Sequence, residues 1–259
     1  MCISPIMVMV DKVIEGKECR VPVTVGCGKC IECLNAYSEE WATRIVDEAS
    51  LYPFNCFVTL TYDNEHCPSE LVKSDLQVFI RELRRKLSPH KIRYFACGEY
   101  GEKGGRPHYH LIIFNFMPND LELYRRGPEP LFKSAFLSDI WQKGFVSVGA
   151  VTRKSAKYCA KYMQKALHIP KTIQQPFILS STRPGIGYGA IRYDNFENDK
   201  IYHDGKIKRL PRYYLKVLER DGFDLSDLKN VRMVKADITL NEASIEARKK
   251  KSEEFFRGY

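Results

Sequence analysis

The sequence feature that most limits the possible folds is the segment from Gly105 to Phe114, in which two histidines precede four apolar residues. His108 and His110 are separated by one residue, and side chains two positions apart in a β-strand lie on the same face of it. The sequence therefore predicts a strand that presents both imidazoles to one divalent metal ion. The same pattern occurs in packed or surface strands and in other kinds of metal site, so its meaning depends on the rest of the chain.

The surrounding segments predict an antiparallel sheet with helices. β-Branched and aromatic runs bounded by turn residues predict four strands, at residues 55–62, 91–98, 105–114 and 145–151. Periodic apolar stripes predict two helices between them, at residues 74–87 and 129–143. The order strand, helix, strand, strand, helix, strand is the split βαβ arrangement. We therefore expect an α+β fold with a ferredoxin-like or RRM-like sheet, helices on one face and a site on the other.

A basic balance favours a polyanionic partner. The 259 residues include 41 Lys and Arg against 32 Asp and Glu, which gives a net charge of +9. A basic surface supplies the sequence-independent part of nucleic-acid binding, so nucleic acid is the first candidate. The chain has no run of 18 apolar residues and its first ten residues lack the pattern of a signal peptide. We therefore expect a cytoplasmic protein with no membrane partner.

Three domains or segments are expected along the chain. Residues 1–50 form a Cys-rich, otherwise irregular segment followed by an amphipathic helix packed on the core. Residues 51–170 form the catalytic core, and residues 171–259 form an extension that contains a hairpin around Asp204-Gly205 and short helices.

The cysteines near the N-terminus have the spacing of a metal site. The run C-x-x-C-x-x-C suits tetrahedral zinc, and it consists of Cys27, Cys30 and Cys33. Cys2 or Cys19 is available as a fourth thiolate. An iron–sulfur cluster and reduced thiols without metal are the alternatives, and Tyr37 stands where a bacterial ferredoxin run has its next cysteine. The odd total of nine cysteines disfavours a secreted disulfide framework.

A second group of candidate site residues follows the fourth strand. Residues 152–167 contain no helix breaker and predict a helix. Tyr158 and Tyr162 then lie on one face, with Cβ atoms roughly 5–6 Å apart, and Lys161 is close to both. Other lysines of this helix are Lys154, Lys157 and Lys165. An isolated pair of this kind is usually a packed stripe, but its position after a His-x-His strand in a basic protein favours a site.

These motifs together resemble the HUH endonucleases, the rolling-circle replication initiators, and among them the gokushovirus-type proteins of microviruses. Residues 57–62 resemble the first motif of that family, His108-Tyr109-His110 resembles the metal-binding second motif, and Tyr158 to Tyr162 resembles the two-tyrosine third motif. The segments 27–33 and 183–187 extend the resemblance to most of the chain.

The resemblance implies a set of catalytic roles. A third metal ligand joins His108 and His110, and Glu99 is expected, with Glu102 as the alternative. Two imidazoles and a carboxylate with open positions suit Mn²⁺ or Mg²⁺. The nucleophiles are expected to be Tyr158 and Tyr162, assisted by Lys161. One tyrosine attacks the scissile phosphate and forms a 5′-phosphotyrosine bond, which preserves the linkage for later rejoining.

The expected partner is single-stranded DNA at the replication origin of a small phage, in the cytoplasm of its bacterial host, together with the host replication helicase and polymerase. The residues expected to contact DNA are Arg106, Lys154, Lys157 and Lys165. Two alternatives remain open. One is a relaxase or transposase of the same superfamily, and the other is a non-catalytic RRM-like module in which the histidines and tyrosines only pack and stack.

Overall fold

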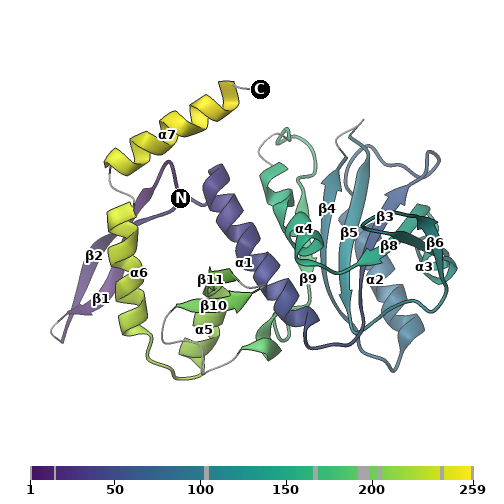
Figure 1. The fold of residues 1–259 in the computed structure, drawn as a ribbon, viewed down its shortest axis with the longest axis horizontal. Helices are drawn as coiled ribbons and strands as arrows, with labels where there is room; N and C mark the ends of the chain where they lie inside the picture. Colours follow the sequence, from purple (N-terminus) through teal and green to yellow (C-terminus); the bar gives the residue numbers. More distant parts are fainter. Residues whose placement is uncertain are drawn as a thin grey trace. The chain divides into compact units, whose positions relative to one another are not determined.

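A computed structural model of the chain describes residues 2–14, 16–101, 105–165, 169–191, 199–203, 206–239 and 242–257. The chain forms two compact units (Figure 1), one of Met1–Tyr37 with Arg192–Tyr259 and one of Ser38–Ile191. The expected division into segments 1–50, 51–170 and 171–259 stays a prediction.

The second unit is built on a seven-stranded antiparallel sheet with the order β6-β7-β8-β3-β5-β4-β9. Its four central strands were expected, and they are β3 (Asn55–Tyr62), β4 (Arg93–Tyr100), β5 (Pro107–Phe114) and β8 (Gly144–Ala150). Because β5 pairs antiparallel with both β3 and β4, the order β8-β3-β5-β4 is the split βαβ arrangement. The α+β fold class is therefore confirmed. Three further strands extend the sheet, namely β6 (Leu121–Arg125), β7 (Leu131–Ser134) and β9 (Phe177–Ser180).

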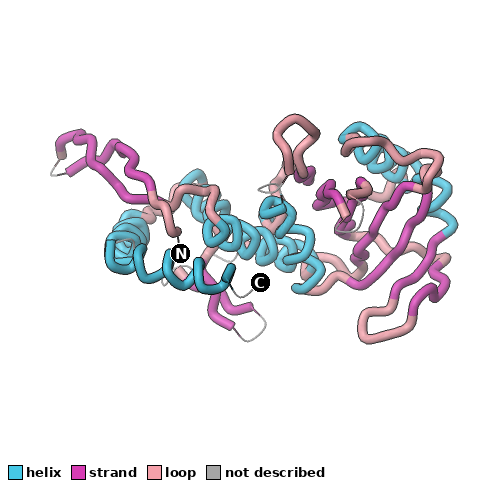
Figure 2. The backbone as a smooth tube through the Cα atoms, turned by 90° about the horizontal axis from the view of Figure 1, so that it is seen from above, coloured by secondary structure: helices cyan, strands magenta, loops and turns pink. Residues whose placement is uncertain are grey.

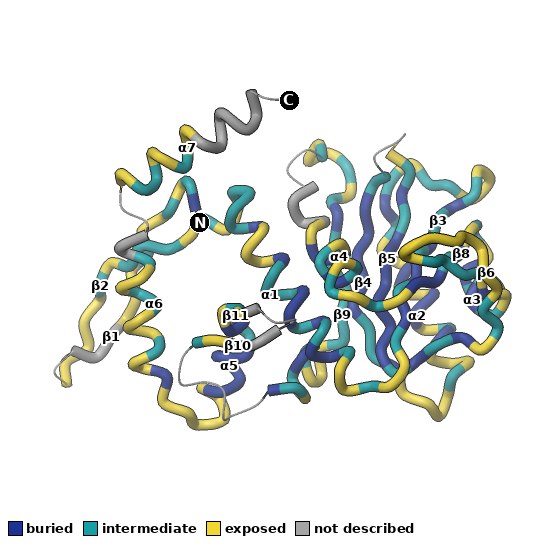
Figure 3. Tube along the Cα trace, in the orientation of Figure 1, coloured by how far each residue is buried: buried dark blue, intermediate teal, exposed yellow. Residues whose placement is uncertain are grey.

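One face of the sheet packs against α2 (Lys73–Leu87) and α3 (Ala135–Trp141). Alternate residues of β3 are buried there, as the period of two along a strand requires. The aromatic residues Phe79 of α2 and Trp141 of α3 meet edge to face in this core. Figure 3 shows the resulting concentration of buried residues along β4 and β5. The helix expected from residue 129 begins only at Ala135, because residues 131–134 form β7.

Helices also cover part of the opposite face, so the expectation of helices on one face only is wrong (Figures 1 and 2). The covering helices are α4 (Arg153–Lys165) and the part of α1 (Ile31–Ala49) that starts at Ser38. They bury Phe95 and Ile112, which point away from the first core. The uninterrupted apolar run at the end of β5 has this cause, since a strand buried on both faces does not alternate. Only the histidine end of this face remains for a site.

The loop that contains residues 183–187 is held from inside the second unit. The buried carboxylate of Glu48 pairs with the guanidinium of Arg93 and accepts a hydrogen bond of 2.7 Å from Gly187 N. Arg93 Nη2 also donates to the carbonyl oxygen of Pro184 over 2.8 Å. Ile186 is fully buried beside α1 and α4. This segment therefore has a packing role, and its turn-rich composition reflects these constraints.

The first unit contains an N-terminal hairpin, so the expectation of an irregular N-terminal segment is wrong. Its strands are β1 (Ile6–Ile14) and β2 (Lys17–Val25). Gly16 has φ 76°, a left-handed conformation that glycine adopts without strain, and it allows the tight turn. The other elements of this unit are β10 (Lys200–His203), β11 (Lys206–Arg209), α5 (Arg212–Arg220), α6 (Ser226–Thr239) and α7 (Glu242–Arg257).

The strands β10 and β11 pair antiparallel, as the expected hairpin requires, and its turn at Asp204-Gly205 lies outside the described residues. Among the described helices of either unit, none combines the length and the apolar character needed to span a bilayer.

Candidate metal centre and adjacent tyrosine

Three side chains converge at the polar end of the second face of the sheet. Glu99 on β4 is the direct cross-strand partner of His108 on β5, and His110 follows two residues later on the same face. Glu99 Oε1 lies 2.6 Å from Nε2 of His108 and 3.1 Å from Nε2 of His110. The ligand atoms of the three residues all lie within 4.8 Å of one another. Regular strand pairing alone thus brings the two imidazoles and the carboxylate together.

The outer nitrogen of each imidazole is held by a neighbour. His108 Nδ1 lies 3.1 Å from the carbonyl oxygen of Arg106. A carbonyl oxygen only accepts, so this nitrogen carries the proton and a neutral ring presents a bare Nε2 to the site. His110 Nδ1 lies 3.0 Å from Oγ1 of Thr59, whose hydroxyl can accept in the same way. Carbonyl and hydroxyl partners of this kind orient the histidine ligands of metals.

The electrostatics of the group call for a cation. Glu99 is 1% exposed and His110 is 5% exposed, while the side chain of His108 is 16% exposed. With both Nε2 atoms bare, three electron-rich atoms face one another in a poorly solvated place. A proton or a metal ion between them offsets that repulsion. Two imidazoles and one carboxylate are ligands that suit Mn²⁺ or Mg²⁺, with positions open toward His108 and solvent.

Tyr158 on α4 lies beside this group. Its hydroxyl is 3.4 Å from Glu99 Oε1, a contact longer than a strong O–H···O hydrogen bond. Its ring meets that of His110 edge to face, with centroids 5.1 Å apart. Tyr158 is 44% exposed, so its phenol faces both the candidate metal ligands and solvent. The site thus contains an accessible oxygen nucleophile.

Two other tyrosines near the motif face the opposite core. Tyr109 lies between the two histidines in sequence and is fully buried on the α2 side of the sheet. Tyr62 bonds to Tyr109 and donates to Asp75 Oδ2 over 2.7 Å. Burial, together with these bonds, raises the pKa of Tyr62 far above its ordinary value. These phenols have packing roles and lie on the wrong face for the site.

The position of α4 depends on small residues that let it approach the sheet. Ala156, Cys159 and Ala160 are fully buried against β4 and β5. Burial and a hydrogen bond with Cys159 raise the pKa of the Cys97 thiol, so this contact stays uncharged. Ser38 Oγ donates to the carbonyl oxygen of Ala160 over 2.9 Å and ties α1 to this helix. These contacts set the height of Tyr158 above His110.

Some expected site residues are only partly described. Tyr162 and Lys165 lie in α4, but their side chains are outside the described part of the chain. The alternative third ligand, Glu102, also lies outside the described residues. Lys161 is exposed on α4. The roles of these residues stay predictions.

The basic residues expected to contact DNA have partners within the protein. Arg106 donates to the carbonyl oxygen of Tyr62 over 2.8 Å and to Asn64 Oδ1 over 2.6 Å. Lys154 pairs with Glu129 over 2.7 Å and Lys157 pairs with Glu39. Arg106 thus stabilises the end of β3, and a contact of these three residues with DNA stays a prediction.

Two residues that support the site were not anticipated. Thr59 is the cross-strand partner of His110, so its role follows from the register of β3 and β5. Gly101 lies so close to His108 that a Cβ atom there would be 3.1 Å from Cε1 of the imidazole. The position of Thr59 in a predicted strand was a weak signal, whereas nothing in the sequence indicated the second contact.

The chain matches a protein-family model and several known proteins. Residues 55–167 match the family described as replication-associated protein ORF2. Over 248 residues the chain is 33% identical to replication-associated protein ORF2 of Spiroplasma virus 4, covering 86% of this chain and 77% of that protein. The chain belongs to the replication-associated proteins of small phages.

Other relatives carry the same description. This replication-associated protein is 38% identical over 151 residues to VP4 of Bdellovibrio phage phiMH2K, covering 54% of this chain and 48% of that protein. It is 36% identical over 212 residues to ORF4 of Chlamydia phage 1, covering 75% of this chain and 53% of that protein. The chain thus spans about half the length of these two relatives. No solved structure is significantly similar to it.

The expected resemblance to gokushovirus-type replication initiators is confirmed by these matches. The matched segment, residues 55–167, includes the candidate metal ligands and both tyrosines of α4.

Proposed function

We propose that this replication-associated protein is a metal-dependent, site-specific endonuclease and strand transferase. It nicks single-stranded DNA at the origin of a small single-stranded DNA phage during rolling-circle replication. The observation that carries this proposal is the position of the Tyr158 phenol beside the convergent group of Glu99, His108 and His110. Family membership supports a role in phage replication.

The metal ligands in this proposal are Glu99, His108 and His110. Their convergent lone pairs and their oxygen and nitrogen donors fit Mn²⁺ or Mg²⁺. Such an ion supplies Lewis-acid polarisation of the scissile phosphate when it is bound. Thr59 and the carbonyl oxygen of Arg106 hold the imidazoles so that each Nε2 faces the ligand group.

The nucleophile is a tyrosine oxygen of α4. The Tyr158 oxygen forms a bond to phosphorus while the bond from phosphorus to the 3′ oxygen breaks. The downstream strand is then linked through its 5′ phosphate to the tyrosine, and the upstream strand leaves with a 3′ hydroxyl. The phenol loses its proton to solvent and the leaving oxygen gains one. A free phenol has a pKa of about 10, and the ammonium of Lys161 favours its ionised form and offsets charge on the leaving oxygen.

Tyr162 supplies a second nucleophile one helical turn away from Tyr158. While one tyrosine holds the first 5′ end, the other attacks the regenerated origin after one round of synthesis. The new 3′ hydroxyl then attacks the first phosphotyrosine, which closes the displaced strand and frees the tyrosine.

The substrate must be single-stranded at the cut, because a duplex cannot deliver one backbone to the end of the sheet beside α4. The cationic residues Arg106, Lys154, Lys157 and Lys165 contact phosphates in this proposal, exchanging their internal partners where they have them. The protein acts in the cytoplasm of the bacterial host, and the host replication helicase and polymerase use the 3′ end that it releases.

The test is adduct formation on an origin oligonucleotide. The full chain is incubated with Mn²⁺ or EDTA and with the same strand labelled at either end, followed by denaturing electrophoresis. We expect a detergent-resistant adduct that carries the 3′ label and appears only with Mn²⁺. Binding without an adduct would instead favour an RRM-like binding module. Adduct formation without release of a primer-competent 3′ end would contradict the replication role.

A further inference from the structure

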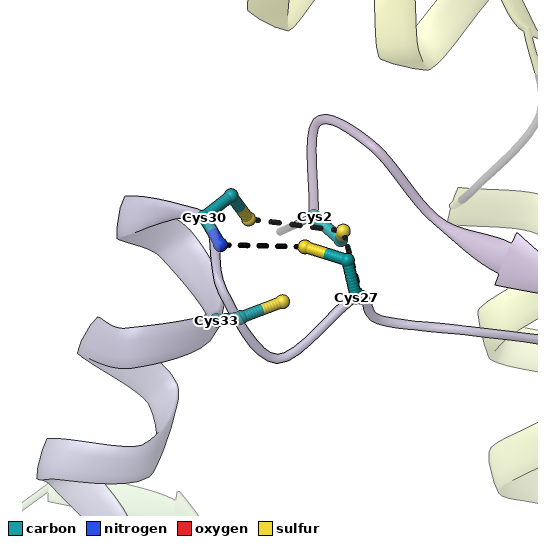
Figure 4. Close-up of side chains that lie close together, drawn as sticks. All are labelled: Cys2, Cys27, Cys30 and Cys33. Carbon is teal, nitrogen blue, oxygen red and sulfur yellow. Dashed lines mark hydrogen bonds between the residues drawn. The ribbon is translucent and has the colours of Figure 1, made fainter. Parts of the chain in front are cut away.

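A second group of metal-type ligands lies in the first unit, far in sequence from the histidines. It consists of Cys2, Cys27, Cys30 and Cys33 (Figure 4), whose sulfur atoms all lie within 4.8 Å of one another. The sulfur atoms of Cys2 and Cys30 are 3.7 Å apart. Four thiolates bonded tetrahedrally to one zinc ion at about 2.3 Å lie about 3.8 Å from one another. The spacing therefore matches a single ion enclosed by four sulfur atoms.

Backbone amides point at these sulfur atoms. Cys27 N donates to Cys2 Sγ over 3.2 Å, and Cys30 N donates to Cys27 Sγ over 3.3 Å. Lys29 N donates to Cys27 Sγ over 3.4 Å. Gly28 has φ 74°, the left-handed conformation that turns the chain between Cys27 and Cys30. Hydrogen bonds of this kind stabilise thiolates, which are the form of cysteine that binds metals.

We propose that Cys2, Cys27, Cys30 and Cys33 bind one structural zinc ion. The sequence left Cys2 and Cys19 as alternative fourth ligands, and the geometry favours Cys2. Cys19 is exposed on β2 and is not part of the group. An iron–sulfur cluster places several iron and sulfide atoms among its thiolates and would hold the sulfur atoms farther apart.

The ion would close the open end of the N-terminal hairpin. Pairing of β1 with β2 ends at Ile6 and Val25, and Cys2 and Cys27 lie just beyond these residues. Many side chains of the hairpin are exposed, including Met7 at 71%, and an isolated two-stranded hairpin is marginally stable. Cys33 lies in the first turn of α1. Zinc would therefore join the N-terminus, the base of the hairpin and the start of α1, and it would supply stability that this small amount of burial lacks.

The experiment measures zinc in the full chain. Protein with His108→Ala and His110→Ala is purified after expression with zinc, so that the other candidate site does not contribute, and zinc is counted by mass spectrometry. We expect one zinc per chain, and X-ray absorption should show four sulfur neighbours at about 2.3 Å. Adding Cys27→Ser and Cys30→Ser together should abolish stoichiometric zinc. Cys19→Ser is the matched control, and it should retain the full amount.

Three results would overturn the proposal: iron with acid-labile sulfide in place of zinc, purified folded protein that takes up no zinc, or full zinc in the variant that lacks all four cysteines. If the serine variants fail to fold, Cys2→His provides the second test. Three thiolates and one imidazole are a common zinc set, so this variant should bind zinc with three sulfur neighbours and one nitrogen neighbour. An unchanged four-sulfur environment in Cys2→His would also contradict the assignment. The zinc count does not depend on whether the protein nicks DNA.

Discussion

Glu99 and His108 are direct partners across β4 and β5, with Glu99 Oε1 only 2.6 Å from His108 Nε2. Both residues lie within strands, and Glu99 is almost completely buried. A site built on paired strands holds its ligands more rigidly than a site on a loop. The expected strand ended at residue 98, so the position of Glu99 inside β4 makes the ligand group more rigid than the sequence indicated.

Removing a proposed metal ligand should abolish tight Mn²⁺ binding. In Glu99→Ala, His108→Ala and His110→Ala, calorimetry with Mn²⁺ should show losses greater than the roughly 10–100-fold typical of outer-shell partners. His66→Ala is the control, because His66 is an exposed histidine that bonds to Asp63 away from the ligand group. Equal affinities in Glu99→Ala and the unmodified protein would remove Glu99 from the ligand set.

Thr59→Val should weaken Mn²⁺ binding without removing a ligand. The substitution keeps the shape of the side chain but deletes the hydroxyl that orients His110, and we expect a loss of about 10–100-fold. Thr61→Val is matched to it, since Thr61 is on the same strand and face, and among the described contacts its hydroxyl bonds neither histidine. Calorimetry that finds the same loss in both variants would argue against an orienting hydrogen bond.

Gly101→Ala should disturb His108. The new Cβ would lie 3.1 Å from Cε1 and 3.5 Å from Nδ1 of the imidazole, so the ring must move by a few tenths of an ångström. We expect a lower Mn²⁺ affinity and less adduct, with the free energy of unfolding nearly unchanged. Unchanged Mn²⁺ affinity would show that the ligand group tolerates this displacement.

Glu48→Ala should destabilise the fold. The Arg93 side chain is 17% exposed and would lose its charged partner, which typically costs about 3–5 kcal/mol when the pair is buried. Glu82→Ala is the control, because Glu82 pairs with Arg85 on the surface, where such pairs contribute about 0–1 kcal/mol. Urea unfolding of the two variants measures both values. Similar small losses in both would contradict a structural role for the pair that holds the 183–187 loop.

The central strands and the histidine pair were predictable because local pattern determines them. The spacing of His108 and His110 fixes a shared face in any strand, and the run from Leu111 to Phe114 predicts burial. The choice of Glu99 came from resemblance and depends on strand register, which the sequence does not show. Coverage of both sheet faces was missed for the same reason, since Phe95 and Ile112 meet α1 and α4 only after the chain has folded.

Other features depend on distant pairing or weak local signals. Phe177 to Ser180 forms β9 by pairing with β4, about 80 residues earlier in the chain, and four residues carry little periodicity. The hairpin of β1 and β2 has Pro22 within a strand and little buried surface, so its sequence resembles a loop. These elements required knowledge of their partners.

The two tyrosines should be partly interchangeable. Tyr158→Phe and Tyr162→Phe each keep the ring but remove one hydroxyl, so we expect reduced but detectable adduct from each single variant and none from the double variant. Tyr124→Phe is a suitable control, because Tyr124 is an exposed tyrosine on the edge strand β6. Denaturing electrophoresis with the 3′-labelled strand measures all four.

The central claim is that a tyrosine of α4 beside the metal ligands becomes covalently bound to DNA. Tandem mass spectrometry of the protease-digested, nuclease-trimmed adduct identifies the modified residue directly. The account predicts a nucleotide linked through phosphate to Tyr158 or Tyr162, formed only when Mn²⁺ is present. A linkage at a serine, a lysine or a tyrosine outside α4 would contradict it.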